Sequence, residues 1–419
     1  MVKDISCKYI AVERSEKMTR KKVIILGAGP LQVPAIRELK KLGAYVICLD
    51  YNPQAEGFEE ADESKVISTR DTRAICEEVK RQQPDVLMTS TSDAPVRIIS
   101  RVSEILGRRC ALSYEDACAV TIKSLMRRRL EEHNVAIPKY MVIGDFEALK
   151  NAYKTVFHES CILKPADNAG SRGVKLLQGE KTESQLRQEY EQCLSCTGNN
   201  MVVIEEIMEG PEVSVEAVTV AGKTKIISIT DKIVCERPYF VEVGHVEPSR
   251  LAADIQNRIK VLARQAIEAM NITDCPSHTE IIVTEDGPKI VEIAARLGGD
   301  FITSRLVPLS TGINMVRASV QMELGERAEL ERKKSRGAAI RFLSVERSGI
   351  VGEIYGVQEA LKEPGVTEAV LYVKPGDEVN PLRSSNDRIG HVIAVGRDAQ
   401  EAWENAGSAY RKIHVVLRK

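Results

Sequence analysis

The stretch "KIVEIAARLGGDFI", residues 289–302, decides how the rest of the chain is interpreted. It begins like a buried strand and then places Glu292 and Arg296 four residues apart, before a turn of two glycines and an aspartate. Charged side chains are rarely buried unless something pairs with them. An ordinary strand end needs neither side chain, so both are candidates for holding a ligand.

A second glutamate is expected opposite Glu292. Glu280, in "HTEIIV", and Glu292 lie on two predicted strands joined by a turn at 285–287, and they are equidistant from Asp286. Like charges directly across a ladder repel one another, so something positive must neutralise them. Carboxylates beside phosphate are the usual setting for Mg²⁺. The hairpin is therefore predicted to hold metal and phosphate, with Arg296 facing a transferred phosphoryl group.

Length and charge set the outer bounds. The 419 residues suit about three domains of typical size. Fifty-nine basic and 60 acidic residues argue against a dedicated nucleic-acid binder. No apolar run approaches the ~20 residues that a membrane span needs, and residues 1–20 look like an extension rather than a signal peptide.

Ten cysteines without a disulfide framework are typical of reduced thiols, so the protein is expected to be cytoplasmic. Cys193 and Cys196 have ligand-like spacing, but no second pair or nearby histidine accompanies them. Incidental thiols are therefore favoured over a metal or redox site.

Strand–helix alternation predicts a parallel-sheet domain over residues 21–119. Its Gly27-Ala28-Gly29 turn resembles a dinucleotide fingerprint, but the third glycine is missing, so a structural turn and a ligand contact stay equally open. A further domain is expected over residues 120–334, and the charged segment 329–335 marks its boundary with a small α+β domain at 335–419. The fold class is thus α/β and α+β.

The segment "KPADNAGSRGV", residues 164–174, has the composition of a phosphate-binding loop. Gly170 and Gly173 lie between two predicted strands, where backbone N–H groups are exposed as donors. Lys164 adds a charge that can reach a phosphate. Taken alone, a hairpin with a solvated lysine is an equally good interpretation, and Lys123, on an earlier basic helix, is better explained alone as part of a solvated face.

The segment "VVIEEIMEGPEVSVE", residues 202–216, predicts a site for a nucleoside. Residues 205–208 follow a β-rich run and can offer backbone donors and acceptors to a flat heterocycle. Glu212 is then placed to accept hydrogen bonds from a ribose diol. A charge cluster at a sheet edge stays the alternative.

Together these pieces resemble the ATP-grasp ligases over residues 22–330. Within that superfamily, "EVGHVEPS" at 242–249 and "EIAARLGGDFI" at 292–302 are most similar to the L-amino acid ligases, which make dipeptides and related amides. The resemblance implies an ATP-grasp fold with an N-terminal Rossmann-like (pre-ATP-grasp) domain, a mobile lid subdomain at about 140–206 and a C-terminal α+β domain. It also implies an ADP-forming ligase that joins a carboxylate to an amine through an acyl-phosphate.

The resemblance further implies Mg²⁺ or Mn²⁺ and small-molecule partners. A homodimer is also expected, with neither nucleic acid nor membrane as a partner. The residues that it assigns to ATP are Lys123, Lys164, Gly170, Ser171, Gly173, Glu205, Glu206, Ile207, Met208 and Glu212, and the 168–173 loop is expected to close over the phosphates. It assigns the metal to Glu280 and Glu292, catalysis to Arg296, His245 and Glu242, and substrate binding to Gly298, Gly299, Asp300 and Arg305.

Asp300 leads to an expectation about the substrate. It follows the Gly298-Gly299 turn, and glycines let a backbone approach a ligand closely. An aspartate there, with Glu242 nearby, favours a cationic or amino-bearing group. The alternative is that Asp300 pairs with Arg305, or caps a turn, and never meets substrate.

Two other functions stay open. A carboxylating or formate-transferring ATP-grasp enzyme, of the purine-biosynthesis or biotin-carboxylase type, shares the nucleotide machinery. A non-catalytic nucleotide-binding module is disfavoured because both carboxylates are present. One departure is Ala294, which stands where the superfamily commonly has an asparagine and removes one possible metal ligand.

Overall fold

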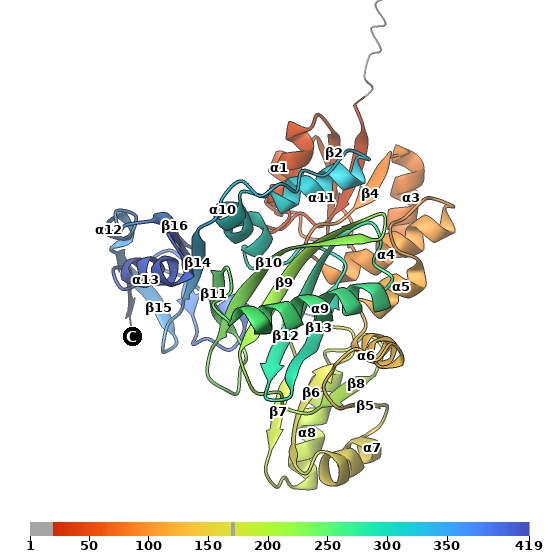
Figure 1. Ribbon diagram of the computed structural model, residues 1–419, viewed down its shortest axis with the longest axis vertical. Helices are drawn as coiled ribbons and strands as arrows, with labels where there is room; N and C mark the ends of the chain where they lie inside the picture. The colour runs from red at the N-terminus through yellow and green to blue at the C-terminus, as the bar shows by residue number, and fades with distance from the viewer. Residues whose placement is uncertain (1–19, 169–171, 419) are drawn as a thin grey trace, which may run out of the picture.

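The computed structural model describes residues 20–168 and 172–418. A long central sheet carries the N-terminal domain at its top, a small subdomain below it and the C-terminal domain at its side (Figure 1). The predicted mixture of α/β and α+β architecture is confirmed. None of the described helices combines the length and apolarity needed to cross a membrane.

The N-terminal domain is a parallel sheet in the order β3-β2-β1-β4. Its two middle strands are almost wholly buried, as expected for parallel strands that are covered on both faces. The elements are β1 (Lys22–Leu26), α1 (Val33–Lys41), β2 (Tyr45–Asp50), α2 (Gly57–Glu60), β3 (Glu63–Val66), α3 (Thr72–Gln82), β4 (Val86–Met88), α4 (Asp93–Ile105) and α5 (Tyr114–Ala119).

The glycine turn after β1 is filled by the protein's own groups. The Asp50 carboxylate accepts a hydrogen bond from the Ala28 N–H at 2.8 Å. The Gln32 amide donates to the hydroxyl oxygens of Thr91, at 2.7 Å, and Ser92, at 3.0 Å. These internal hydrogen bonds give the turn a structural role, because Gln32 fixes the loop from which α4 begins.

The central sheet is antiparallel, in the order β13-β12-β9-β10-β11-β14-β18-β16. Helix α9 crosses one face of it and buries Ile259, Ala263 and Ile267 (Figure 1). The elements that form and cover this sheet are α6 (Lys123–Glu132), β9 (Glu212–Val220), β10 (Lys223–Val234), β11 (Glu242–Glu247), α9 (Ala253–Ala269), β12 (Pro276–Thr284), β13 (Gly287–Ala294), η2 (Ile302–Leu306), α10 (Val307–Thr311), α11 (Met315–Glu323), β14 (Gly337–Leu343), β16 (Val366–Leu371) and β18 (Gly390–Gly396).

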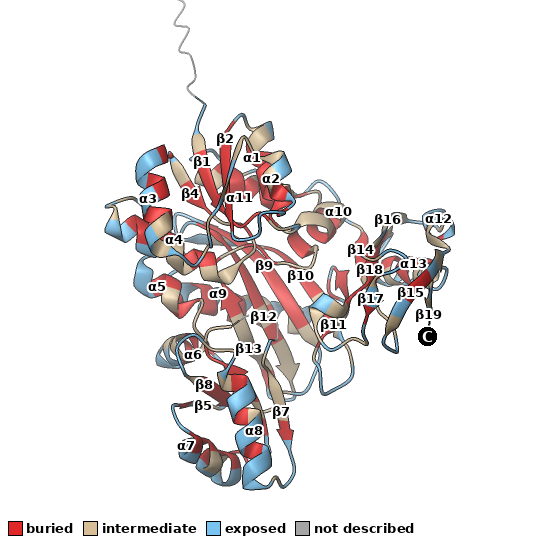
Figure 2. Cartoon of the chain, turned by 180° about the vertical axis from the view of Figure 1, so that it is seen from behind, coloured by how far each residue is buried: buried red, intermediate tan, exposed pale blue. Residues whose placement is uncertain are grey.

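The lower subdomain has a separate sheet, in the order β5-β8-β6-β7. Helix α8 turns a buried stripe to that sheet and leaves its outer face exposed (Figure 2). Leu163, Leu186 and Ile204 belong to a hydrophobic core that is this subdomain's own. Its elements are β5 (Tyr140–Ile143), α7 (Phe146–Asn151), η1 (Ala152–Val156), β6 (Ser160–Pro165), β7 (Lys175–Gln178), α8 (Glu183–Leu194) and β8 (Val202–Glu205).

The C-terminal domain shares the central sheet. Strand β14 pairs with β11 on one side and with β18 on the other, so the sheet runs without a break past residue 335. A three-stranded sheet, β17-β15-β19, and helix α13 complete the domain. The remaining elements are β15 (Gly349–Tyr355), α12 (Val357–Ala360), β17 (Glu378–Val379), η3 (Ser385–Asp387), α13 (Ala399–Tyr410) and β19 (His414–Arg418).

Candidate active site

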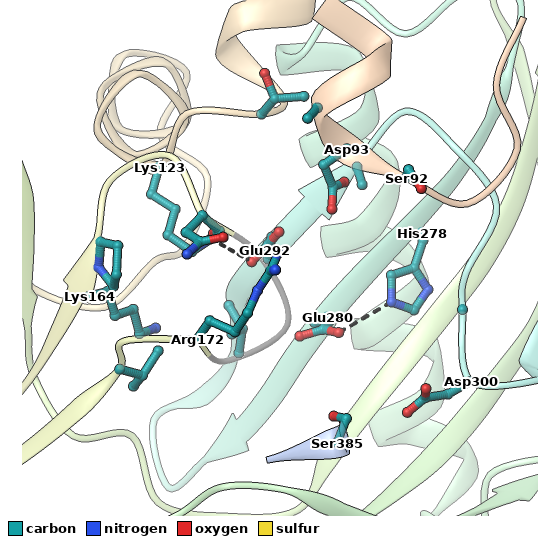
Figure 3. Close-up of a pocket in the computed structure, with 18 of the residues that line it drawn as sticks. Ser92, Asp93, Lys123, Lys164, Arg172, His278, Glu280, Glu292, Asp300 and Ser385 are labelled. Atoms are coloured by element: carbon teal, nitrogen blue, oxygen red, sulfur yellow. Dashed lines mark hydrogen bonds and ion pairs between the residues drawn. The ribbon is translucent and has the colours of Figure 1, made fainter. Parts of the chain in front are cut away.

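A cavity of about 870 Å³ lies where the N-terminal domain, the lower subdomain and the central sheet meet (Figure 3). The predicted site residues that line it are Lys123, Lys164, Glu205, Glu206, Met208, Glu212, Glu242, His245, Glu280, Glu292, Arg296, Gly299 and Asp300. Those that do not line it are Gly173, Ile207, Gly298 and Arg305. Gly170 and Ser171 lie outside the described residues.

The two predicted metal carboxylates are register partners, as the sequence indicated. Glu280 pairs directly with Glu292 across β12 and β13, and both face the cavity (Figure 3). Nearer the turn the register is different, since Thr284 pairs with Gly287 and Ile281 with Ile290. A bulge in β13 therefore brings the carboxylates opposite one another, which turn geometry alone would not do.

A separate lysine neutralises each carboxylate. Lys123 Nζ lies 3.1 Å from Glu292 Oε2, and Lys232 Nζ lies 2.9 Å from Glu280 Oε1. Burial opposes ionisation of Glu280, but the Lys232 ammonium outweighs it and holds the pKa of that carboxyl well below its ordinary range. Glu280 is thus held as an anion, and Glu292 faces the Lys123 ammonium.

The donor set fits a metal that shares its shell with phosphate. Among the described residues there is no group of three or more metal-ligating side chains, and a metal held by Glu280 and Glu292 would take its remaining ligands from phosphate oxygens and water, as Mg²⁺ does. His278 is not a free ligand, because facing carboxylates outweigh its burial and raise its pKa to about 9. Ala294 lines the cavity near Glu292 and supplies no ligand.

Lys164 is held by a buried cluster that the sequence did not reveal. Its Nζ lies 2.7 Å from Glu205 Oε2, while Arg127 Nε lies 2.7 Å from Glu205 Oε1. Burial would raise the pKa of Glu205, but the two cations lower it to about 2. Because Glu205 is 1% exposed and pairs with Tyr140 and Ile162 in the sheet, its side chain anchors Lys164 rather than forming an open hinge.

Lys232 joins three of the predicted site residues and was not predicted itself. Its Nζ lies 2.6 Å from Glu212 Oε1, 2.9 Å from Glu280 Oε1 and 3.4 Å from Glu242 Oε1. Burial would lower its pKa, yet the three carboxylates raise it well above the ordinary value. A lone lysine in the strand pattern "IISITDKIV", flanked by glutamate-bearing strands, is the signal that could have identified it.

Arg296 is fixed by a residue from the N-terminal domain. Its Nε and Nη2 lie 2.7 and 2.9 Å from the two carboxylate oxygens of Asp93. Asp93 is the first residue of α4, directly after the loop that Gln32 holds. The guanidinium thereby has a fixed orientation beside the hairpin carboxylates, which is what binding a developing phosphate charge requires.

Asp300 lines the cavity in an unusual backbone conformation. Asp300 and Phe301 have φ values of 48° and 63°, in the left-handed region that side chains with a Cβ rarely adopt. Asp300 Oδ2 lies 2.8 Å from Arg388 Nη1 and 3.6 Å from His245 Nε2. Burial would raise the pKa of Asp300, but these neighbours lower it far below its ordinary value.

The alternative role for Asp300 was a pair with Arg305, and that pairing is wrong. Arg305 Nε instead lies 2.7 Å from Glu368 Oε1 of β16. Arg388 also binds Glu242, with Nη2 2.9 Å from Oε2. The negative charges that favoured a cationic substrate are therefore already neutralised by the protein.

Gly298 is required by packing. A Cβ built there would lie 2.7 Å from His278 Nδ1 and 2.9 Å from both carboxylate oxygens of Glu216. Those two side chains form a buried pair, with His278 Nδ1 2.5 Å from Glu216 Oε1. Gly298 thus makes room for a pair that sequence reasoning missed, and His278 Nε2 in turn lies 3.2 Å from Glu280.

Cys193 and Cys196, the pair with ligand-like spacing, both lie in the lower subdomain. Cys193 is buried, Cys196 is half-buried, and both are free thiols. Burial raises the pKa of Cys193 to about 12, which makes it a poor nucleophile or ligand.

Two family models match the chain. Residues 157–304 match the ATP-grasp domain, and residues 341–418 match the L-amino acid ligase C-terminal domain 2.

Curated proteins align with the chain at less than 30% sequence identity. The uncharacterized protein y4rH of Sinorhizobium fredii is 29% identical over 248 residues, which is 58% of this chain and 50% of that protein, so this chain covers half of that relative's length. A formate-dependent phosphoribosylglycinamide formyltransferase of Burkholderia vietnamiensis is 23% identical, covering 94% of this chain and 95% of that protein. An L-arginine-specific L-amino acid ligase of Bacillus subtilis is 24% identical, covering 65% of this chain and 66% of that protein.

A solved structure agrees with the fold. The L-amino acid ligase from Bacillus licheniformis superposes with a TM-score of 0.81 at 19% identity, covering 96% of this chain and 99% of that one. The order of elements, the cavity and the two matched domains lead to one conclusion. Residues 157–304 thus belong to an ATP-grasp domain, which is followed by an L-amino acid ligase C-terminal domain at residues 341–418.

Proposed function

We propose that the protein is an ATP-dependent, ADP-forming carboxylate–amine ligase that acts on small L-amino-acid-like substrates. The observation that carries the proposal is the meeting, in one cavity, of the opposed Glu280 and Glu292 with Arg296, Lys123 and Lys164. The match of residues 341–418 to an L-amino acid ligase domain supports the choice of amino acids as substrates.

The nucleotide is proposed to bind between the lower subdomain and the hairpin. Lys164 is oriented by Glu205, and Lys123 by Glu292 and by the Asn168 carbonyl at 2.7 Å, so both ammonium groups are positioned to meet phosphate oxygens. Residues 206–208 would contact adenine, and Glu212 would accept from ribose. A magnesium ion bound by the two hairpin carboxylates would neutralise phosphate charge.

The reaction consists of two displacements. A substrate carboxylate oxygen attacks the γ-phosphorus of ATP, the bond to the β–γ bridging oxygen breaks, and ADP leaves. The amine nitrogen then attacks the acyl carbon, phosphate leaves, and the ammonium proton is lost to solvent. Catalysis of such steps is mostly positioning and charge stabilisation. Arg296, with its orientation fixed by Asp93, would stabilise the acyl-phosphate.

A second candidate uses the same first step with a different acceptor. The Burkholderia relative is a formate-dependent formyltransferase and matches 94% of this chain, which supports formate as carboxylate and a phosphorylated amine as acceptor. A non-catalytic nucleotide-binding module is less well supported, because the charged set around the cavity is complete.

The test is ATP-dependent phosphate release over a matrix of carboxylates and amines, with products identified by mass spectrometry. The ligase proposal expects ADP, phosphate and an amide only when an amino-acid carboxylate and an amine are both present. Product from formate would select the second candidate instead. ATP binding without turnover in every combination would contradict both. The predicted homodimer is a separate hypothesis that light scattering checks.

A further inference from the structure

The cations that line the cavity are not equivalent. Most are already paired with the protein's own groups, and these are Lys123, Lys164, Lys232 and Arg296. Arg172 is also engaged. The exceptions are Arg70, in the loop after β3, and Arg97, in the second turn of α4. Within residues 20–168 and 172–418, neither guanidinium finds a hydrogen-bond or ion-pair partner.

Arg70 and Arg97 both lie on the wall of the cavity that the N-terminal domain forms. Arg97 follows Asp93 by one helical turn, so the two side chains share a face of α4, and Asp93 holds Arg296. Figure 3 shows Ser92 and Asp93 entering the cavity from a different side than Lys123 and Lys164. The two unpaired guanidiniums therefore belong to the same wall of the cavity as Asp93, which contacts Arg296.

An arginine with five unused donors in a cavity matches a planar or tetrahedral anion. Guanidinium groups bind carboxylate and phosphate through paired, charge-assisted hydrogen bonds. The phosphates of ATP are met by the lysines and the hairpin, and the acyl-phosphate by Arg296. At the other end of the cavity, Asp300 is already neutralised by Arg388. The remaining positive charge has no anion to bind within the proposed nucleotide and acyl-phosphate sites.

We propose that Arg97, assisted by Arg70, binds the anionic end of the acceptor amine and so determines which acceptors the protein uses. This inference rests on the proposed ligase function. The shared chemistry is an anion at the far end of the acceptor, and either a carboxylate or a phosphate supplies it. The nucleophilic nitrogen would then point toward Arg296 and the acyl carbon.

The experiment compares three acceptors that have the same amine: the free amino acid, its carboxamide, and an aminoalkyl phosphate. Wild-type protein should use one of the anionic acceptors with a KM lower than that of the carboxamide by roughly tenfold or more, since charge-assisted contacts are the strong ones. R97A should raise the KM for that acceptor by a similar factor and leave the KM for ATP and for the carboxamide unchanged. R70A should act in the same direction.

The chain offers matched controls. Arg101 lies one turn further along α4 and pairs with Glu104, and Arg73 pairs with Glu77 on an exposed face of α3. R101A and R73A should leave every KM unchanged. If the protein prefers the phosphate acceptor, the anion site is supported and its ligand is a phosphate.

Equal use of acid and carboxamide by the wild type, or an R97A effect on ATP instead of the acceptor, would overturn the inference while leaving the ligase function intact. If no acceptor supports turnover, the proposed function fails. The anion site is then judged by calorimetric binding of the same acceptors in the presence of a non-hydrolysable ATP analogue. Binding that is equal for the three acceptors, or unchanged in R97A, overturns it.

Discussion

The guanidinium of Arg296 and the carboxylate of Asp93 form two parallel contacts, at 2.7 and 2.9 Å, between residues that are 203 positions apart in the chain. This pair ties the end of the central hairpin to the first turn of α4. The orientation of the arginine proposed to act on phosphate is thus decided by the N-terminal domain.

Asp93→Asn should lower kcat by roughly 10- to 100-fold, because the arginine loses its charged partner and its fixed geometry. The KM for ATP should change little, since Asp93 is not among the residues proposed to bind nucleotide. Asp254→Asn, at an exposed position in the first turn of α9, is the matched control. A normal kcat in Asp93→Asn would show that the pair is structural only.

Glu280→Gln and Glu292→Gln should each abolish magnesium-dependent ATP turnover while the fold persists, because only ligand charge is removed. Steady-state rates over a magnesium titration, with circular dichroism for folding, make the measurement. Glu285→Gln, in the exposed turn of the same hairpin, should behave as wild type. Near-normal turnover in both cavity variants would remove the metal assignment.

Glu205→Gln should destabilise the protein by about 3–5 kcal/mol, because Arg127 and Lys164 would be left as buried charges without their anion. Glu206→Gln breaks only a partly exposed pair with Lys289 and should cost about 1 kcal/mol or less. Urea denaturation of the two variants measures the difference. Equal losses would mean that the buried cluster is not what stabilises this part of the sheet.

The same cluster makes the free energy of unfolding depend on pH in the acid range. The pKa of Glu205 is about 2 in the folded protein, below its ordinary value of 4.5. A depressed carboxyl pKa adds stability that is present above the unfolded value and is lost as pH falls through the folded value. Unfolding free energy should therefore fall between about pH 4.5 and 2, and the fall should be smaller in Glu205→Gln. The same slope in both proteins would contradict the assignment.

Glu247 makes the stability of the fold depend on pH in the opposite direction. Burial, and then the nearby Glu216, raise its pKa from 4.5 to about 8. A raised folded-state pKa adds stability that is complete below the unfolded value and disappears as pH rises through the folded value. The melting temperature should fall between about pH 4.5 and 8, and Glu247→Gln should flatten that fall. A profile that is unchanged by the substitution would show that Glu247 does not titrate in this range.

Arg388→Met tests whether the charge at the proposed amino-acid end of the cavity determines which substrate is used. Glu242 and Asp300 would lose their shared cation, so the ratio of kcat/KM for a cationic over a neutral amino acid should rise by about tenfold. Arg383→Met changes an exposed arginine five residues earlier and should leave the ratio unchanged. No shift in Arg388→Met would mean that neither carboxylate faces the substrate.

The features that depend on residues close together in the sequence were predicted. Strand alternation and turn residues predicted the hairpin that carries Glu280 and Glu292, and the cavity contains most of the charged residues that were singled out. The bulge that completes this register leaves no trace in the hydrophobic pattern. Helices between residues 302 and 323 were not predicted, because they are short and begin with a π-helical turn before Pro308.

The partners of the site residues were missed for a different reason. Asp93, Arg127, Lys232 and Arg388 each look like an ordinary surface charge in their own segment. Each becomes part of the site only when the fold brings it to a residue on another element, as Arg388 is brought to Glu242 across 146 positions. Side-chain pairing over such separations depends on tertiary packing, which periodicity does not report.

The unbroken sheet from β13 to β16 has a mechanical consequence. Moving the C-terminal domain away from the hairpin would require the β11–β14 ladder to separate, whereas the lower subdomain has its own sheet and core and can tilt without breaking any strand pairing in the central one. Opening and closing during turnover should therefore involve the lower subdomain and not the C-terminal domain. The end of the cavity that contacts the C-terminal domain would keep a constant shape. Amino acids would then be selected by a rigid surface, and closure of the lower subdomain would start the reaction.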